Sequence, residues 1–411
     1  MRALALALTL LAAPLAAQTI EDPEGTVMGQ GREDGSEAGF RDWVTVFRTR
    51  ALEAGVPAAV YDREMRTATY LPDVVARDRR QTEFTKTIWD YLDIAVSSER
   101  VSNGRDAVAR NVALLDRIEA EYAVDKEVVA AIWGLESAYG TWRGTTDTVS
   151  ALATLAYDGR RAAFFETQLV QALKILDEGH VTRDRMVGSW AGAMGHTQFM
   201  PTSWAEFAVD FNGDGKRDIW SDDPADALAS TANYLRHWGW TRGLPWGLEV
   251  SLPDGFDYDQ TTERVKKPAA DWRMLGVTPA AGGDLPDGDG TSVLLPAGHS
   301  GPAFLITPNF QVIEKYNLAD AYVIGIGHLS DRLRGGPAIA AAWPRQWQAL
   351  TLEERQELQS RLVALGLDTG GVDGRIGPKT IAAVKAWQKT KGLVPDGYPS
   401  PDVLAALRNP G

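Results

Sequence analysis

The sequence predicts a mainly α-helical protein with a small β portion, followed by a compact three-helix unit at its C-terminus. Apolar residues recur at helical spacing from residue 40 to about residue 240. Short strand-like runs separated by Pro, Gly and Asp follow up to about residue 315, and a second helical pattern fills the last part of the chain. The 411 residues, of which 44% are hydrophobic, are enough for two or three domains with ample core.

The composition argues against several classes of protein. A formal net charge of −13 argues against a nucleic-acid partner. The chain has no cysteine, which excludes disulfides, thiolate nucleophiles and cysteine zinc sites. The five histidines are scattered without an HExxH pattern, and no GxSxG occurs, so neither a zinc enzyme nor a nucleophile-elbow hydrolase has local support.

The first 18 residues have the form of a signal peptide. Arg2 supplies the positive charge, residues 3–13 the apolar core and residues 15–17 the small-residue end, so cleavage is expected near Ala17. An uncleaved anchor fits less well because the apolar run is short, and no later run is long and apolar enough to span a membrane. We therefore expect an exported, periplasmic protein. Residues 19–39, polar and Gly-rich, are expected to form a flexible lead.

Periodicity places the elements of the region from 40 to 334. Helical spacing is shown by two sets of apolar residues: Leu114, Ile118 and Tyr122, and then Phe165, Leu169, Leu173 and Leu176. Strand-like runs cover four short ranges: 248–252, 292–295, 303–306 and 310–316. Residues 319–334 have a helical pattern again, and residues 335–349, which contain GGP and WP, are expected to be a linker.

Residues 350–411 form the separate C-terminal unit. Thr351 and Glu354 make a capping box, Pro378 suits the first position of a second helix, and a third helix begins near Ser400 and Pro401. This unit shows no acid–base constellation, which favours a binding module over a second enzyme. A stabilising appendage is the alternative.

The run AIWGLESAYGTWRG at 131–144 places one carboxylate among apolar, aromatic and small residues. At 100° per residue, Val129, Ile132 and Glu136 fall on one helical face. A carboxylic acid in such surroundings has a raised pKa and keeps its proton near neutral pH, as a general acid requires. The alternative is a partly buried Glu136 paired with the nearby Arg143.

Residues 188–204, GSWAGAMGHTQFMPTSW, form a second candidate segment. Four of the five residues from 191 to 195 are small, so the backbone can approach a ligand closely. Ser189, Thr197 and Gln198 can hydrogen-bond a neutral polar substrate such as a sugar. A tight loop between packed helices would give the same composition.

The segment DFNGDGKRD at 210–218 has the front half of an EF-hand calcium loop. Oxygen-bearing side chains stand at loop positions 1, 3, 5 and 9: Asp210, Asn212, Asp214 and Asp218. Gly215 stands at position 6, and Lys216 at position 7 contributes its backbone carbonyl. A metal-free turn rich in Asp and Asn is the alternative.

The twelfth position of this loop is Ser221, where a regular EF-hand has a bidentate Glu. The last carboxylate must then come from further along the chain. We expect it to be Asp226, with Asp223 as the second choice. The sequence predicts a structural Ca²⁺, although another cation would fit the same oxygens, and it predicts no cofactor for catalysis.

The run NFQVIEKYNLADAY at 309–322 is dense in aromatic residues. Tyr316, Asn317 and Tyr322 can present ring faces and an amide to a sugar. A role in the hydrophobic core is the alternative.

Taken together, these motifs resemble the lytic murein transglycosylase B family over about residues 40–334. The resemblance rests on GLESAYGTWRG, ALATLAYDGRRAAFFETQL, AGAMGHTQFMPTSW, DFNGDGKRDIW and KYN. It implies a lysozyme-like catalytic domain and a metal loop starting at Asp210. The insertion SDDPAD makes this loop two residues longer than the family form, which leaves the last ligand open. The C-terminal unit resembles a peptidoglycan-binding domain, with DGRIGPKT as its recognisable part.

The resemblance also assigns roles to residues. Glu136 corresponds to the family's catalytic glutamate. The substrate-contacting residues correspond to Ser189, Gln198, Tyr234, Tyr316, Asn317 and Tyr322. The metal ligands would be Asp210, Asn212, Asp214, Lys216 and Asp226. The implied reaction is cleavage of the β-1,4 bond between N-acetylmuramic acid and N-acetylglucosamine in peptidoglycan, with formation of 1,6-anhydro ends during cell-wall remodelling or turnover.

Two other functions stay open. A hydrolytic muramidase needs a second acid, for which Asp147 is the nearest candidate, and a non-catalytic wall-binding protein needs none. The partners implied by the resemblance are peptidoglycan glycan strands, with other cell-wall enzymes as further candidates, and a monomer is expected.

Overall fold

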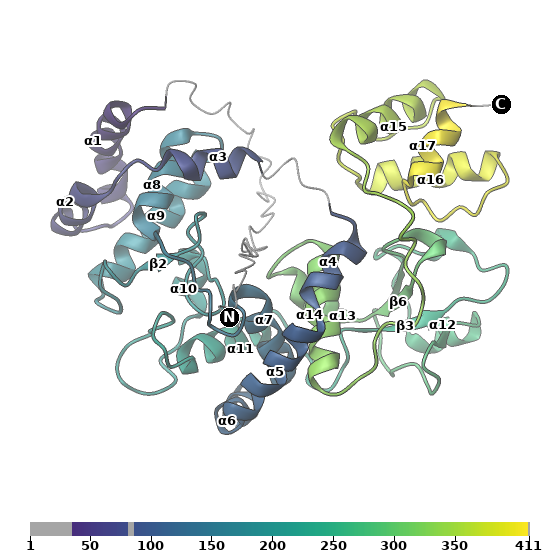
Figure 1. The fold of residues 1–411 in the computed structure, drawn as a ribbon, viewed down its shortest axis with the longest axis horizontal. Coiled ribbons are helices and arrows are strands. Elements are labelled where there is room, and N and C mark those ends of the chain that lie inside the picture. Colours follow the sequence, from purple (N-terminus) through teal and green to yellow (C-terminus); the bar gives the residue numbers. More distant parts are fainter. Residues whose placement is uncertain (1–34, 81–85, 410–411) are drawn as a thin grey trace, which may run out of the picture. The chain divides into compact units, whose positions relative to one another are not determined.

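The computed structural model describes residues 35–80 and 86–409, and these residues are mainly helical with two small sheets (Figure 1). The predicted fold class is confirmed. The predicted signal peptide and the lead up to residue 34 lie outside the described residues. The helix α1 begins at Glu37, so the last three residues assigned to the lead are helical. No described helix has the combined length and hydropathy needed to span a bilayer.

The described residues divide into two compact units. The first contains the residues up to Val74 together with Ile132–Ser230, and the second contains Val75–Ala131 together with the residues from Thr231 onwards. Three helices pass from one unit into the other: α3 (Pro72–Arg80), α7 (Lys126–Ser137) and α11 (Ala225–His237).

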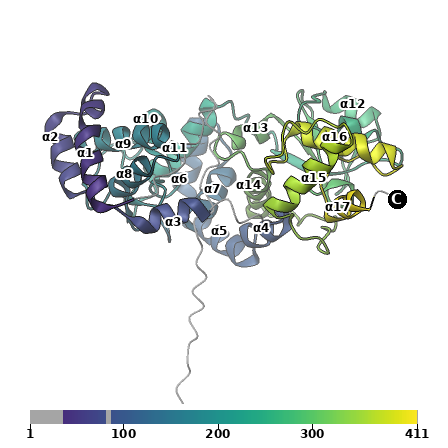
Figure 2. The same ribbon diagram turned by 90° about the horizontal axis from the view of Figure 1, so that it is seen from above.

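The first unit is built around helix α8, which is buried along its whole length. Its elements are α1 (Glu37–Glu53), α2 (Ala58–Thr67), β1 (Thr146–Asp147), α8 (Thr148–Asp158), α9 (Ala162–Asp177), β2 (Val187–Gly188) and α10 (Pro201–Phe207). The helices α1, α2 and α9 each contact another helix of this group, and they lie together in both views (Figures 1 and 2). The predicted apolar stripe of α9, which begins at Phe165, is buried as expected.

The second unit combines helices with a four-stranded antiparallel sheet of order β4-β3-β6-β5. Its helices include α4 (Ile88–Ala95), α5 (Ser98–Arg110), α6 (Val112–Tyr122), α12 (Ala269–Met274), α13 (Pro308–Glu314) and α14 (Asp320–Leu333). The strands are β3 (Gly247–Ser251), β4 (Thr278–Pro279), β5 (Ser292–Leu294) and β6 (Ala303–Ile306), and two short 3₁₀ helices cover Tyr258–Gln260 and Gly298–Ser300. Trp272, Val293 and Leu305 are fully buried in the core beside this sheet.

Two expectations for this unit need correction. The run 310–316 was expected to be a strand, but it lies mostly in helix α13. Thr307 caps this helix through its side chain and Pro308 takes its first position, and Phe310 and Ile313 are buried one helical turn apart. In α6 the predicted Ile118 and Tyr122 are buried, but the third buried residue is Leu115, and Leu114 is only half-buried.

The C-terminal module contains the three predicted helices, α15 (Leu352–Ala364), α16 (Pro378–Thr390) and α17 (Pro401–Arg408). The capping box at Thr351, Pro378 at the start of α16 and the cap of α17 by Ser400 are all present. Leu358, Val384 and Trp387 lie in a core of its own. The predicted linker, residues 335–349, contains no helix or strand.

Candidate active site

Glu136 lies one residue before the end of α7 and is only 5% exposed. Val129 and Ile132 on the same helix are fully buried, so the predicted apolar face is present. The chain then reverses sharply, because Ala138 (φ +49°) and Tyr139 (φ +59°) both adopt the left-handed region. Non-glycine residues in that region cost on the order of 1 kcal/mol each and persist where the surrounding structure fixes them.

The end of α7 is fixed by the loop that carries His196. The hydroxyl of Ser137 donates to the carbonyl of His196 (2.5 Å) and accepts the N–H of Gly140 (2.9 Å). The indole Nε1 of Trp133 donates to Nδ1 of His196 (3.1 Å), and the ring of Tyr139 meets that of Trp133 edge-on. These contacts hold the helix end that presents Glu136 in one conformation.

His196 is held as a neutral imidazole of one tautomer. Since Nδ1 accepts from Trp133, Nε2 carries the hydrogen and donates to the carbonyl of Ser221 (2.7 Å). Burial lowers the pKa of His196, and the positive charge of Arg143 adds to this, against the opposing effect of the Ser221 hydrogen bond. No local sequence pattern marks this histidine, because its partners lie far away in the chain.

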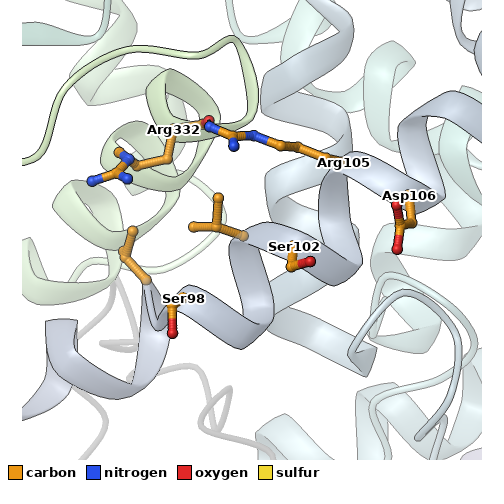
Figure 3. A pocket seen from close by; sticks show the side chains of 7 residues that line it. Ser98, Ser102, Arg105, Asp106 and Arg332 are labelled. Atoms are coloured by element: carbon orange, nitrogen blue, oxygen red, sulfur yellow. The ribbon is translucent and has the colours of Figure 1, made fainter.

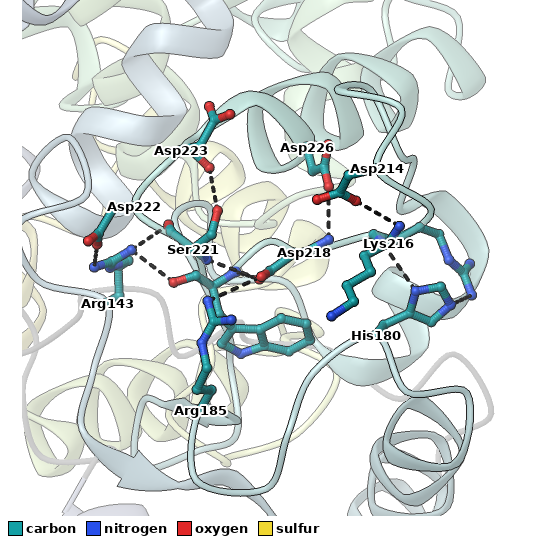
Figure 4. A network of polar contacts seen from close by, with 12 residues as sticks. Arg143, His180, Arg185, Asp214, Lys216, Asp218, Ser221, Asp222, Asp223 and Asp226 are labelled. Carbon is teal, nitrogen blue, oxygen red and sulfur yellow. Dashed lines mark hydrogen bonds and ion pairs between the residues drawn. The ribbon is translucent and has the colours of Figure 1, made fainter.

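Arg143 was considered as an ion-pair partner for Glu136. In the structure its guanidinium donates to the carbonyls of Trp220 (2.9 Å) and Ser221 (2.6 Å) and forms an ion pair with Asp222 (2.6 Å; Figure 4). Arg143 therefore anchors the turn after Glu136 to residues 220–222, which follow the EF-hand-like loop at 210–218.

Ser189 and Gln198 are buried, and backbone groups hold both side chains. The Oγ of Ser189 accepts the N–H groups of Ala191 (3.3 Å) and Ala193 (3.1 Å), so its own hydrogen remains for donation. The Nε2 of Gln198 donates to the carbonyls of Gly195 (2.8 Å) and Arg143 (3.2 Å). Its Oε1 has no hydrogen-bond partner among the described residues and remains as an acceptor. Both side chains are thus oriented before any ligand arrives.

The small residues between 191 and 195 bring the loop against the protein itself, and the expected close approach of its backbone to a ligand stays a prediction. A Cβ on Gly192 would lie 2.3 Å from the side chain of Leu152, and one on Gly195 (φ +71°) would lie 2.4 Å from the carbonyl of Ile219. This packing requires the glycines, as expected for a tight loop between packed helices.

Asp147, the candidate second acid, has its carboxylate held by hydrogen bonds from Ser150 and Arg183. It caps α8 by accepting the N–H of Ser150 (2.7 Å), and both its oxygens accept from Arg183 at 2.7 Å. Burial alone would raise the pKa of Asp147, but the hydrogen bonds from Arg183 and Ser150 bring it below its usual range. A carboxylate held in this way is suited to a structural role.

The segment from Asp210 folds as a tight loop around its carboxylates. The oxygens of Asp210 accept N–H groups from Gly213 (2.8 Å), Asp214 (3.1 Å) and Gly215 (2.8 Å). The side chain of Asn212 accepts from the N–H of Asp214 (3.0 Å). The side chains at loop positions 1, 3 and 5 thus each accept backbone N–H groups within the turn, with Asp214 accepting that of Lys216 (2.9 Å).

Asp226 closes this loop from helix α11 and is only 1% exposed (Figure 4). One of its oxygens accepts the N–H groups of Phe211 (2.9 Å) and Asn212 (3.3 Å), and the other accepts that of Asp218 (2.9 Å). It thus joins the start of the loop to its ninth position. Asp223 is exposed and accepts only the nearby N–H of Ala225. Asp226 and not Asp223 therefore closes the loop, and metal binding by these residues stays a prediction.

Four predicted substrate contacts lie in the second unit: Tyr234, Tyr316, Asn317 and Tyr322. All four are buried. The hydroxyl of Tyr234 donates to the carbonyl of Lys315, its ring meets that of Tyr316 edge-on at 5.1 Å, and the rings of Tyr316 and Tyr322 are nearly parallel at 6.5 Å. The structure brings these residues into one cluster, and their contact with substrate stays a prediction.

Comparison with known proteins identifies the family of the chain. The model of a family described as the transglycosylase SLT domain matches residues 39–331. The chain belongs to this transglycosylase family. The predicted family and enzyme class are therefore confirmed. A second model, described as a putative peptidoglycan binding domain, matches residues 351–407.

Individual transglycosylases and related structures are similar over most of the chain. The membrane-bound lytic murein transglycosylase B of Escherichia coli (strain K12) is 33% identical over 259 residues, which is 61% of this chain and 67% of that protein. SltB3 from Pseudomonas aeruginosa, in complex with NAG-anhNAM-pentapeptide, has a TM-score of 0.87 at 48% identity and covers 90% of this chain and 99% of its own. The Escherichia coli lytic transglycosylase SLT35, in complex with calcium, has a TM-score of 0.59 at 27% identity, covering 76% of this chain and 97% of its own.

This transglycosylase also contains an acidic cluster that the sequence analysis missed. Glu263, Glu314 and Asp320 place carboxylate oxygens within 4.8 Å of one another in the second unit. Burial and mutual repulsion raise the pKa of Glu314 to about 7 and that of Asp320 to about 7. No local pattern indicates this cluster, because Glu263 is distant in the sequence from Glu314 and Asp320, which end α13 and begin α14.

Because of the raised pKa values in this cluster, we expect the free energy of unfolding to depend on pH. In the unfolded chain these acids lose their protons near pH 4, whereas the folded protein keeps them up to about pH 7. The folded state therefore binds more protons in this window, and the free energy of unfolding falls as the pH rises from about 4 to about 7. Glu314→Gln should reduce this fall and raise the melting temperature above pH 7 by about 2–4 °C. Melting curves at several pH values measure this, with the exposed Glu121 of α6, changed to Gln, as the control. Equal pH dependence in the variant and the unaltered protein would contradict the prediction.

Proposed function

We propose that this transglycosylase cleaves the β-1,4 bond between N-acetylmuramic acid and N-acetylglucosamine in peptidoglycan and leaves 1,6-anhydro-muramyl ends. The observation that carries the proposal is the burial of Glu136 at the fixed end of α7, while Asp147 is bound by Arg183. Of the two candidate acids, only Glu136 is then available, where an ordinary glycosidase uses two. SltB3 supports the proposal, since it binds a disaccharide with an anhydro sugar.

In this mechanism Glu136 acts twice. It first donates its proton to the glycosidic oxygen as the bond to the muramyl C1 breaks. The N-acetyl oxygen of the substrate stabilises the positive charge that develops at C1, in place of a second carboxylate. The ionised Glu136 then removes the proton from the muramyl 6-hydroxyl, whose oxygen bonds to C1. Glu136 ends the reaction protonated, as it began, and no water is consumed.

The other predicted residues bind and orient the glycan. Ser189 offers a hydroxyl hydrogen and Gln198 a carbonyl oxygen, both preset by the backbone. Tyr234, Tyr316, Asn317 and Tyr322 would contact sugar rings, which pack well against aromatic faces. The loop residues Asp210, Asn212, Asp214, the Lys216 carbonyl and Asp226 would hold Ca²⁺, which would stabilise the loop without entering the reaction.

The remaining assignments follow from this activity. The module at 350–411 would hold the enzyme on the glycan polymer and raise its local concentration there. Peptidoglycan lies outside the cytoplasm, so we propose that residues 1–18 direct export to the periplasm. A monomer that works beside other cell-wall enzymes is consistent with this location.

A digest of sacculi in water enriched in ¹⁸O tests the reaction. The new muramyl ends should carry no label and should be lighter by one water than reducing ends, as measured by mass spectrometry. A hydrolytic muramidase digested in parallel gives labelled ends and serves as the control. Labelled ends from this enzyme would mean that water is the nucleophile and that a second carboxylate acts. Absence of any cleavage would favour a non-catalytic wall-binding protein.

A further inference from the structure

Trp142 is a large aromatic residue that the reaction described above does not use, and its side chain is 70% exposed. In the described part of the first unit, the exposed large apolar side chains are those of Trp142 and Val46, so Trp142 is the only aromatic among them. The other tryptophans of this unit are buried: Trp43, Trp133, Trp190, Trp204 and Trp220. Folding usually buries most of an indole, so the exposure of Trp142 indicates a use outside the core.

The backbone of Trp142 is held beside Glu136. Its N–H donates to the carbonyl of Ser137 (2.9 Å), the residue that follows Glu136. This bond closes the turn in which Ala138 and Tyr139 adopt the left-handed region. Trp142 is therefore attached to the same helix end as the acid, within the first unit.

The residues after Trp142 are fixed as well. The guanidinium of Arg143 is bonded to residues 220–222 (Figure 4), and the carbonyl of Arg143 accepts from Nε2 of Gln198 (3.2 Å). Gly144 packs so closely that a Cβ there would lie 2.1 Å from the backbone of β2. With the backbone fixed, only the two side-chain torsions of the indole are free, so a ligand that covers it costs little conformational entropy.

The chemistry of an exposed indole fits a sugar ring. A β-linked pyranose such as N-acetylglucosamine carries its polar substituents around the edge of the ring and C–H groups on its two faces. The indole supplies a wide apolar face for such C–H groups and one N–H donor at its edge. The turn is bonded to the residue after Glu136 at one end and to Gln198 at the other. A glycan bound by these two residues therefore has a sugar within reach of Trp142.

A pocket of about 400 Å³ between α5 and α14 is the alternative place for a glycan (Figure 3). All its lining residues belong to the second unit. Its polar side chains are Ser98, Ser102, Arg105, Asp106 and Arg332. No aromatic side chain of the described residues lines it, so it offers a sugar no ring to stack on.

We propose that the indole of Trp142 stacks on a sugar ring of the glycan strand, beside the pair of sugars whose bond Glu136 cleaves. The proposal deepens the proposed function and rests on it, because it takes the same glycan as the substrate. Trp142 then binds substrate without taking part in the proton transfers.

The indole N–H signals of the ¹⁵N-labelled full chain test this contact by NMR. The signal of Trp142 is the one that Trp142→Phe removes. Titration with tetra-N-acetylchitotetraose, a neutral β-1,4-linked glycan, should shift this signal until binding saturates. The titration uses the Glu136→Gln variant, so that no glycan is consumed. A Trp142 signal that stays in place at the highest glycan concentration would overturn the proposal.

The rate of cleavage of soluble glycan strands tests the role in substrate binding. Trp142→Ala should lower kcat/KM about tenfold, mainly by raising KM, because stacking is present before and during the reaction. Trp142→Phe keeps an aromatic face and should stay within about threefold of the unaltered protein. Val46→Ala, an exposed apolar change in the same unit, is the matched control and should leave kcat/KM unchanged. Melting curves establish that each variant is folded.

Three kinetic results would contradict the proposal. The first is an equal kcat/KM for Trp142→Ala and the unaltered protein. The second is a fall in kcat at unchanged KM, which would mean that Trp142 acts on Glu136 and not on the sugar. The third is a loss in Ser102→Ala without one in Trp142→Ala, which would place the glycan in the pocket of the second unit. If the unaltered protein cleaves no sacculi, the proposed function fails, whereas the NMR titration still tests the contact between Trp142 and a sugar.

Discussion

Glu136→Gln should abolish turnover of sacculi while the protein stays folded. The amide has nearly the shape of the acid but can neither donate the proton to the glycosidic oxygen nor remove one from the 6-hydroxyl. Since one residue would serve both steps, we expect a loss of at least about a thousandfold, at the upper end of general acid–base contributions. Release of soluble muropeptides, followed by mass spectrometry, measures the rate.

Asp147→Asn is the informative companion variant. It weakens the ion pair with Arg183 and the cap of α8, so it should lower the melting temperature and leave a measurable rate. If this variant folds and is as inactive as Glu136→Gln, Asp147 takes part in the chemistry and the enzyme is a muramidase. Retention of more than a few per cent of activity by Glu136→Gln would remove Glu136 from the catalytic role.

Asp226→Ala should be the most destabilising change among the residues that hold the EF-hand-like loop at 210–218. It removes a buried carboxylate and leaves the N–H groups of Phe211, Asn212 and Asp218 without their acceptor. The N–H of Asp218 is buried, whereas the bonds from Phe211 and Asn212 are only partly buried. An orphaned buried donor costs about 1–3 kcal/mol, so we expect the melting temperature to fall by about 5–10 °C. Asp223→Ala, which loses one local hydrogen bond, is the matched control and should change it by about 1 °C or less.

Calcium should act through the same residue. Millimolar calcium should raise the melting temperature of the unaltered protein relative to excess chelator, because a ligand of the folded state stabilises it by mass action. The increase should disappear in Asp226→Ala and persist in Asp223→Ala. Superimposable melting curves of the unaltered protein with calcium and with chelator would show that this loop needs no cation.

Local signals in the sequence were sufficient for much of the fold. The Thr351 capping box, Pro378 at the start of α16 and Ser400 before α17 act within a few residues, and each appears in the structure as expected. The error at 310–316 arose because a short apolar run fits a strand or a helix equally well. The cap by Thr307 and the proline after it decided for the helix.

The sequence by itself determined the mainly helical class, the family, and Glu136 as a carboxylate on an apolar helical face. Only the tertiary structure decided how that residue is held: His196 lies about sixty positions away, and bonds from Trp133 and Ser137 join it to the end of α7. The same holds for the ion pair that occupies Asp147 and for the acidic cluster. Caps and periodicity depend on neighbours in the chain, whereas hydrogen bonds, burial and charge depend on distances that only the folded chain creates.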